Sequence, residues 1–131
     1  MKRPVELVEE VIKLSHFPMD DIFLDSIPSE EIEAINKTQI LLTEAKNTPS
    51  EYGNSQFISI DYGVYIQIFY SNDPNLTIDI TKSELELMQY LTENNWLILR
   101  SDAHYPDIDT GQMIKNITVQ RTMTLSEIAN S

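Results

Sequence analysis

The arrangement in this sequence that comes nearest to a metal site is the pentapeptide Asp107-Ile108-Asp109-Thr110-Gly111. Carboxylates at alternate positions before a glycine resemble the first half of a calcium-binding loop. A complete loop of this kind has a bidentate glutamate at its twelfth position, and that position is Thr118, inside an expected strand. We therefore interpret the pentapeptide as a turn between two strands, in which Gly111 supplies a positive φ angle.

Histidines and glycines provide no second candidate for catalysis or nucleotide binding. His16 and His104 both lie in expected turns, and neither has another His or a Cys at the spacing of metal ligands. Gly53, Gly63 and Gly111 are isolated, whereas phosphate-binding loops need clustered glycines. The sequence therefore predicts no catalytic residue, no cofactor and no bound metal.

Composition narrows the class of protein further. The chain has 131 residues, 21 acidic against 9 basic, a net charge of −12 and no cysteine. Tight nucleic-acid binding requires clustered Lys and Arg, so this charge argues against it. No window approaches the ~20 apolar residues of a membrane span. We expect a soluble intracellular protein in which residues 1–131 form a single domain.

The elements that would position any site follow from hydrophobic spacing and turn residues. We expect an α+β fold, with a mostly antiparallel sheet of about five to six strands flanked by two helices on one face. The ordered core covers residues 4–123, and residues 124–131 are expected to be a loose tail. The expected helices are 4–15 and 81–94, with a turn or single helical turn over 28–35, and the expected strands are 22–24, 38–44, 57–60, 64–70, 96–99 and 113–123.

Two local features carry specific expectations. Thr81-Lys82-Ser83-Glu84 fits a capping box at the start of the second helix, whose buried stripe would contain Leu85, Leu87, Met88 and Leu91. The stretch 45–56 is rich in Asn, Pro, Ser and Gly and is expected to be the longest loop. Loops of this length in small domains are often functional or mobile.

The expected strand Val64–Tyr70 carries more apolar and aromatic area than a small domain with two short helices covers on both faces, and Leu125 and Ile128 add further apolar area. Aromatic side chains at strand spacing belong more often to a core or an interface than to a ligand pocket. The surplus therefore predicts burial against another copy of the chain, which would also protect exposed sheet edges. The expected subunit-interface residues are Ile66, Phe69, Tyr70, Leu125 and Ile128.

Several stretches together resemble the tail-component family of siphophages and lactic-acid-bacterial prophages. The resemblance lies in Thr48-Pro49-Ser50-Glu51-Tyr52-Gly53-Asn54, in the strands Ile58-Ser59-Ile60 and Val64-Tyr65-Ile66-Gln67-Ile68-Phe69-Tyr70, in Asn95-Trp96, and in Asp109-Thr110-Gly111-Gln112 before the long last strand. It extends from about Leu7 to Thr122, and none of its motifs is catalytic.

This resemblance implies a structural protein, a tail terminator or tail completion protein that caps the tail tube and joins it to the head. It implies a ring of copies, commonly six, whose partners are the major tail tube protein and the head–tail connector protein. The protein would occur in the cytoplasm of a bacterial host during assembly and then in the virion. Two loops would contact the tube or connector through Asn47, Tyr52, Asn54, His104, Tyr105 and Asp107.

Three alternatives stay open at this point. The chain is similar in size and acidity to other neck or minor tail components, including head–tail joining proteins. Residues 14–36 contain six acids and no Lys or Arg, which would suit a small acidic protein that mimics DNA or binds a basic partner. The least favoured alternative is an enzyme using His104, Asp107 and Asp109.

Overall fold

The computed structural model describes residues 1–131 and contains one six-stranded sheet. The strands follow the order β1-β2-β3-β6-β4, and the short β5 pairs with β6. Every neighbouring pair is antiparallel except β1 and β2. The predicted α+β class and mostly antiparallel sheet are therefore confirmed. The strands are β1 (Asp21–Leu24), β2 (Gln39–Gly53), β3 (Gln56–Phe69), β4 (Leu97–Ser101), β5 (Tyr105–Pro106) and β6 (Met113–Thr124).

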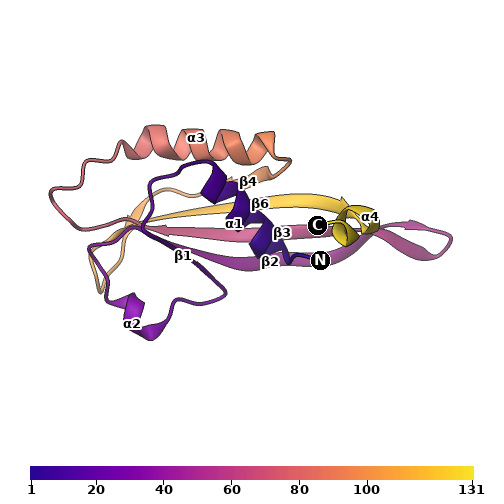
Figure 1. The fold of residues 1–131 in the computed structure, drawn as a ribbon, viewed down its shortest axis with the longest axis horizontal. Coiled ribbons are helices and arrows are strands. Elements are labelled where there is room, and N and C mark those ends of the chain that lie inside the picture. The colour runs from indigo at the N-terminus through magenta and orange to yellow at the C-terminus, as the bar shows by residue number, and fades with distance from the viewer.

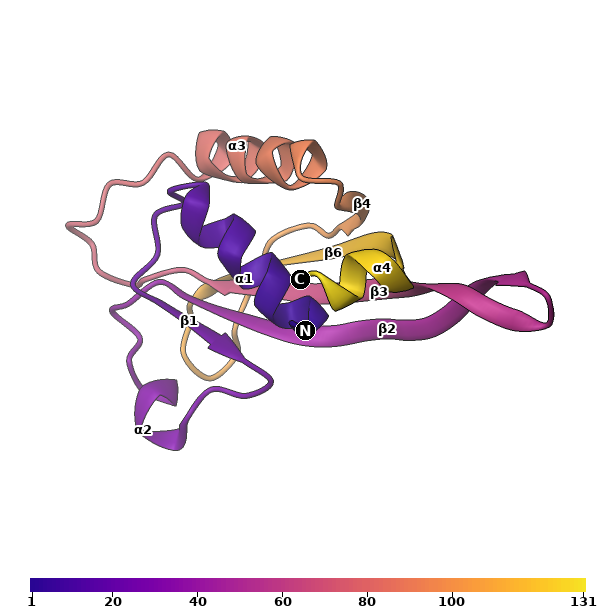
Figure 2. The same cartoon turned by 45° about the vertical axis from the view of Figure 1, so that its right-hand side comes forward.

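Four helices accompany the sheet, and they are α1 (Pro4–Leu14), α2 (Ser29–Ile32), α3 (Ile80–Glu93) and α4 (Leu125–Ala129). Side chains of α1, α3 and α4 join one buried cluster with the sheet, which places these helices over the same face (Figure 1 and Figure 2). In α1, Val5, Val8 and Ile12 recur at helical spacing and are fully buried. None of the four helices combines the length and the apolar character that crossing a membrane requires.

The core lies between these helices and one face of the sheet. Successive side chains of a strand point to opposite faces, so alternate residues of β3 enter the core. Val64, Ile66 and Ile68 are fully buried there, facing Leu87 and Leu91 of α3 within one cluster. Full burial of one such side chain stabilises the fold by about 1.5–3 kcal/mol. The core therefore depends on the alternation of the central strand.

The expected loop over residues 45–56 is a long β-hairpin instead. β2 and β3 stay paired as far as Gly53 and Gln56, and the hairpin extends past the rest of the molecule, at the end opposite α2 (Figure 1 and Figure 2). Asn54 and Ser55 have φ angles of 52° and 65°. Positive φ at both central residues is typical of a two-residue type I′ turn, whose twist matches that of the strands. We call residues 45–62 the arm.

The base of the arm contains a β-bulge. Glu44 pairs with Val64 and Lys46 pairs with Gly63, so Ala45 is the extra residue of β2. A Cβ atom at position 63 would lie 3.0 Å from Cβ of Lys46 and 3.1 Å from its backbone nitrogen. Gly63 is therefore required by the close approach of the bulge, and β3 continues through this position without the interruption expected at 61–63.

The last residues form a helix rather than the expected loose tail. The hydroxyl of Thr124 accepts a hydrogen bond from the backbone N–H of Glu127, and the Glu127 carboxylate accepts from the backbone N–H of Thr124. This reciprocal capping box stabilises the first turn of α4. Ile128 then joins the core, and the backbone N–H of Lys2 donates to the hydroxyl of Ser131. The capping signal, T-x-x-E, is present in the sequence.

The start of α3 also differs from expectation. Asp79, not Thr81, caps the helix, because its carboxylate accepts a hydrogen bond from the backbone N–H of Lys82. Of the predicted stripe, Leu87 and Leu91 are buried, Met88 is half-buried and Leu85 is exposed. Glu84 shares the buried face with Leu87 and Leu91, so it lies inside the protein rather than at a helix cap.

Candidate functional site

A buried polar cluster joins α3, the end of β3 and the loop after β4. Glu84 is only 4% exposed, and one of its carboxylate oxygens accepts a hydrogen bond of 2.5 Å from the Tyr70 hydroxyl. Nε2 of His104 lies 2.8 Å from the same oxygen. Burial, together with the bond to Glu84, raises the pKa of the Tyr70 phenol, so the phenol stays protonated. The cluster connects three elements that are distant in sequence.

Lys115 adds a second polar anchor to the same loop. It lies on β6, is buried, and its ammonium group donates to the backbone carbonyl oxygen of Asp102. The loop between β4 and β6 is thus held by His104 at α3 and by Lys115 at the sheet. No serine or threonine hydroxyl is hydrogen-bonded to Tyr70, Glu84 or His104, and the chain has no cysteine. This arrangement restrains the loop between β4 and β6 at both of its polar contacts.

Sequence reasoning missed Glu84 as a buried group. It assigned this residue to a capping box because Thr81 precedes it by three positions. A signal was available, since Glu84, Leu87 and Leu91 follow the i, i+3, i+7 spacing of one helix face. A glutamate on that face needs a buried partner. Tyr70 and His104 supply one, but neither is adjacent to Glu84 in the sequence.

The interpretation of Asp107–Gly111 as a turn is confirmed. The Asp107 side chain accepts from the backbone N–H of Asp109, and its carbonyl oxygen accepts from the N–H of Gly111. Gly111 has a φ angle of 74°. No group of three or more His, Cys, Asp or Glu side chains is placed to hold a metal ion. Nearby, the Tyr105 hydroxyl accepts from the amide of Asn116.

The five residues expected at a subunit interface separate into two groups. Ile66, Tyr70 and Ile128 lie in the core of a single chain, where α1, α3 and α4 already cover the sheet. Phe69 is half-buried on the opposite face, and Leu125 is 43% exposed. Only Phe69 and Leu125 therefore retain surface that a second chain could contact.

The arm presents apolar side chains that no other part of the chain covers. Tyr52 pairs directly with Phe57 across the hairpin, and Tyr52 is 69% exposed. Ile58 is also exposed, on the opposite face of the hairpin. Asn47 and Asn54, named with Tyr52 as contact residues, are exposed as well. The structure thus gathers this group of predicted residues on one projecting element.

A polar network fixes the base of the arm. The Asp61 carboxylate accepts hydrogen bonds from the Thr122 hydroxyl at 2.6 Å and from the Ser50 hydroxyl at 3.0 Å. Nζ of Lys46 lies 3.5 Å from the same carboxylate. The bonds from Thr122 and Ser50, assisted by Lys46, lower the pKa of Asp61. The network links β2, β3 and β6 on the face that carries no long helix.

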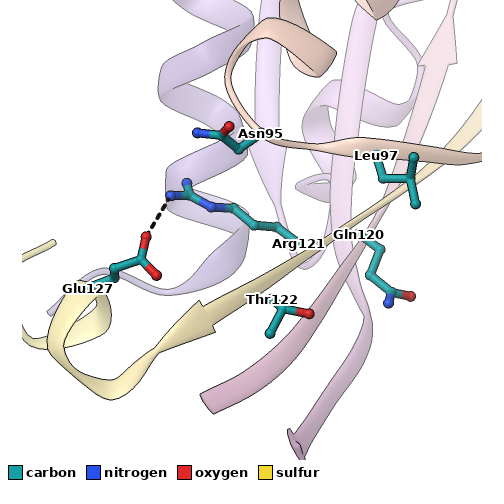
Figure 3. Close-up of a pocket in the computed structure, with 6 residues that line it drawn as sticks. All are labelled: Asn95, Leu97, Gln120, Arg121, Thr122 and Glu127. Atoms are coloured by element: carbon teal, nitrogen blue, oxygen red, sulfur yellow. Dashed lines mark hydrogen bonds and ion pairs between the residues drawn. The ribbon is translucent and has the colours of Figure 1, made fainter. Parts of the chain in front are cut away.

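A hollow of about 450 Å³ lies where β4 stops and β6 continues (Figure 3). β4 pairs with β6 only over Ile117–Gln120, whereas β6 stays paired with β3 as far as Thr124. Arg121–Thr124 therefore have a neighbouring strand on one side only. The hollow is lined by Asn95, Leu97, Gln120, Arg121, Thr122 and Glu127.

Arg121 is the central side chain of this hollow. It extends from β6 toward Glu127 of α4, with Asn95 beside its guanidinium group (Figure 3). The distance from Arg121 to the Glu127 carboxylate is 3.4 Å, and the guanidinium carbon is 6.0 Å from the ring centre of the buried Trp96. Thr124, with help from Arg121, lowers the pKa of Glu127. The long ion pair leaves Arg121 able to bind a further acceptor.

Part of the acidic segment has structural partners. Arg3 donates two hydrogen bonds of 2.7 Å to Asp25, and these lower the pKa of the Asp25 carboxyl. Asp20 accepts from the backbone N–H of Thr38 at 2.7 Å. Lys37 lies within 4 Å of both Asp21 and Glu31. These contacts favour a surface role for the segment over a continuous acidic binding site.

The fold and the sites define an α+β protein with one helix-covered sheet face, a projecting hairpin and a restrained loop. Residues 2–124 match the profile of a family described as proteins of unknown function, DUF806, and the chain belongs to this family. A search among curated proteins found no match.

Proposed function

We propose that the protein is a structural subunit of a bacteriophage tail, a tail terminator or tail completion protein that forms a ring between the tail tube and the head connector. The observation that carries this proposal is the arm, which extends an ordered strand pair and exposed apolar side chains beyond the folded body. Isolated two-stranded hairpins are marginally stable in water. An element of this kind suits a protein that works by contact with other chains.

Two further features support an assembly role. β4 and the outer part of β2 have strands on one side only, so the sheet has free edges on both sides. Two different edges allow a heterologous contact, which produces a ring when the rotation between copies closes. In addition, the buried cluster at Glu84 holds the loop after β4 against α3 and the end of β3. The sequence resemblance to phage tail components agrees with these features.

The acidity would serve this role as well. A channel that DNA passes through during infection should not retain phosphates, and a net charge of −12 per copy repels them. The same charge makes copies repel one another, which salt reduces because the screening length is about 8 Å at physiological ionic strength. Self-association should therefore strengthen as salt is raised from low concentration.

The test is to interrupt this gene in a prophage and image the particles after induction by electron microscopy. We expect filled heads and tails that are not joined, and restoration of complete particles when the intact gene is supplied in trans. Complete infectious particles without the protein would contradict the proposal. Purified protein should also form rings in negative stain, and a chain that is monomeric at every concentration and salt would count against a ring.

A further inference from the structure

We infer that the arm of one copy inserts into the hollow at β4, β6 and α4 of a second copy. This inference rests on the self-association that the proposed function requires, and it names the surfaces that form the joint. The occupant is an extended segment of the same protein, centred on Tyr52 and Phe57.

The shape of the hollow indicates an extended occupant. Gln120 and Thr122 point to the uncovered face of the sheet, whereas Arg121 points to the helix face, because neighbours on a strand alternate. The hollow therefore surrounds the edge of β6 on both faces, at the position that a further strand would occupy. Strand addition at a free edge is a common way to bind an extended segment.

Charge determines which extended segment of a second copy can enter the hollow. Two copies at −12 each repel strongly, so a joint between them must use surfaces with little negative charge. Residues 47–60, which include the exposed part of the arm, contain a single charged residue, Glu51. The hollow contains Arg121 and Glu127, with Arg121 only loosely bound to Glu127 at 3.4 Å. Glu51 can therefore pair with Arg121 of the next copy.

Apolar contact adds to this complementarity. Tyr52 and Phe57 lie side by side on one face of the arm, and Leu97, at the rim of the hollow, is 60% exposed. Tyr carries both an aromatic ring and a hydroxyl, which suits a site where Leu97 lies among Asn95, Gln120 and Thr122.

The arm cannot reach the hollow of its own chain. Thr122 pairs with Asp61, and the tip at Asn54 lies seven residues further along the paired hairpin. At about 3.3 Å per residue the tip is on the order of 20 Å away, pointing outward. Insertion therefore joins different copies through two unlike surfaces, the head-to-tail contact from which rings are built.

The chain has no cysteine, which permits a direct test by cross-linking. A Gln56→Cys variant, altered on the arm, is mixed with a Leu97→Cys variant that carries a size tag, and a short bismaleimide is added. We expect a cross-linked heterodimer. The matched control mixes Gln56→Cys with Gln89→Cys, altered at an exposed position of α3, and should give no such product.

A second variant tests the energetic role of the aromatic pair. Tyr52→Ser with Phe57→Ser should weaken self-association about tenfold or more and remove the cross-link, while the melting temperature of the monomer, measured at low protein concentration, stays unchanged. Oligomers that form without the 56–97 cross-link would overturn this joint and leave the proposed function standing. A permanently monomeric chain would overturn both. If the arm cross-linked only to another virion protein in an infected-cell extract, the proposed joint between copies would also be overturned.

Discussion

The hydroxyl of Tyr70 donates a 2.5 Å hydrogen bond to the buried carboxylate of Glu84, joining the end of the central strand to α3. His104 contacts the same oxygen from the loop after β4. The central strand, α3 and the loop after β4 therefore meet at one carboxylate oxygen of Glu84. Removing this carboxylate should weaken the packing of all three elements.

Tyr70→Phe should lower the free energy of unfolding by about 1–3 kcal/mol, because it leaves a buried carboxylate with one fewer donor. Urea unfolding followed by circular dichroism measures the change. Tyr52→Phe is the matched control: this hydroxyl is exposed on the arm, and its removal should have little effect. Equal destabilisation by the two variants would contradict a structural role for the buried bond.

Gly63→Ala should destabilise the protein by about 1–3 kcal/mol, because the new methyl group would be forced against Lys46 at the bulge. Gly53→Ala is the control, since a Cβ atom there would lie 3.6 Å from Ile58, an ordinary contact distance. The midpoint of urea unfolding reports both. If Gly63→Ala were as stable as wild type, the bulge geometry described here would be incorrect.

Asp61 should make stability depend on pH in the acidic range. Its pKa is lowered in the folded protein by Thr122 and Ser50, assisted by Lys46, so the folded state favours the charged form. This contribution is fully present above the unfolded pKa, about 4, and is lost as pH falls through the lower folded pKa. Asp61→Asn should therefore cost more stability at pH 7 than at pH 2–3. Asp109→Asn, whose side chain makes no hydrogen bond or ion pair, should show no such difference.

Ile128→Ala should destabilise the monomer by about 2 kcal/mol, near the lower limit for isoleucine truncation because the residue lies at the margin of the core. Leu125→Ala, one turn earlier and 43% exposed, should cost less. Thermal unfolding at low protein concentration separates this effect from oligomerisation. A larger loss from Leu125→Ala would mean that α4 packs differently.

The sequence predicted the strands that alternate and the helices with a clear apolar stripe. Val64–Phe69 lies in the expected strand because of its β-branched and aromatic content, and Leu87–Leu91 lies in the expected helix because its apolar spacing reflects burial against the core. The turn at Asp107–Gly111 was predictable for a local reason, since Asp and Gly have strong turn preferences.

The arm and the buried cluster were harder to predict because each depends on distant pairing. The abundance of Asn, Pro and Ser predicts a loop over residues 45–56, yet β3 supplies pairing partners for Lys46–Ser50, Tyr52 and Gly53. A glycine at position 63 predicts a break in the strand, although Gly63 is the residue that accommodates the bulge. The burial of Glu84 was hard to predict because its partners, Tyr70 and His104, are distant in the sequence and are brought to it only by the fold.

The position of β6 in the sheet has a bearing on biosynthesis. β6 is the last strand to be made, yet it lies between β3 and β4. While the ribosome is still translating residues 70–112, the apolar edge of β3 has no neighbour on that side, and β4 has no strand to pair with. Nascent chains at this stage are exposed to wrong strand pairing. A fragment ending before Met113 should therefore precipitate or recruit chaperones, whereas the full chain remains in solution.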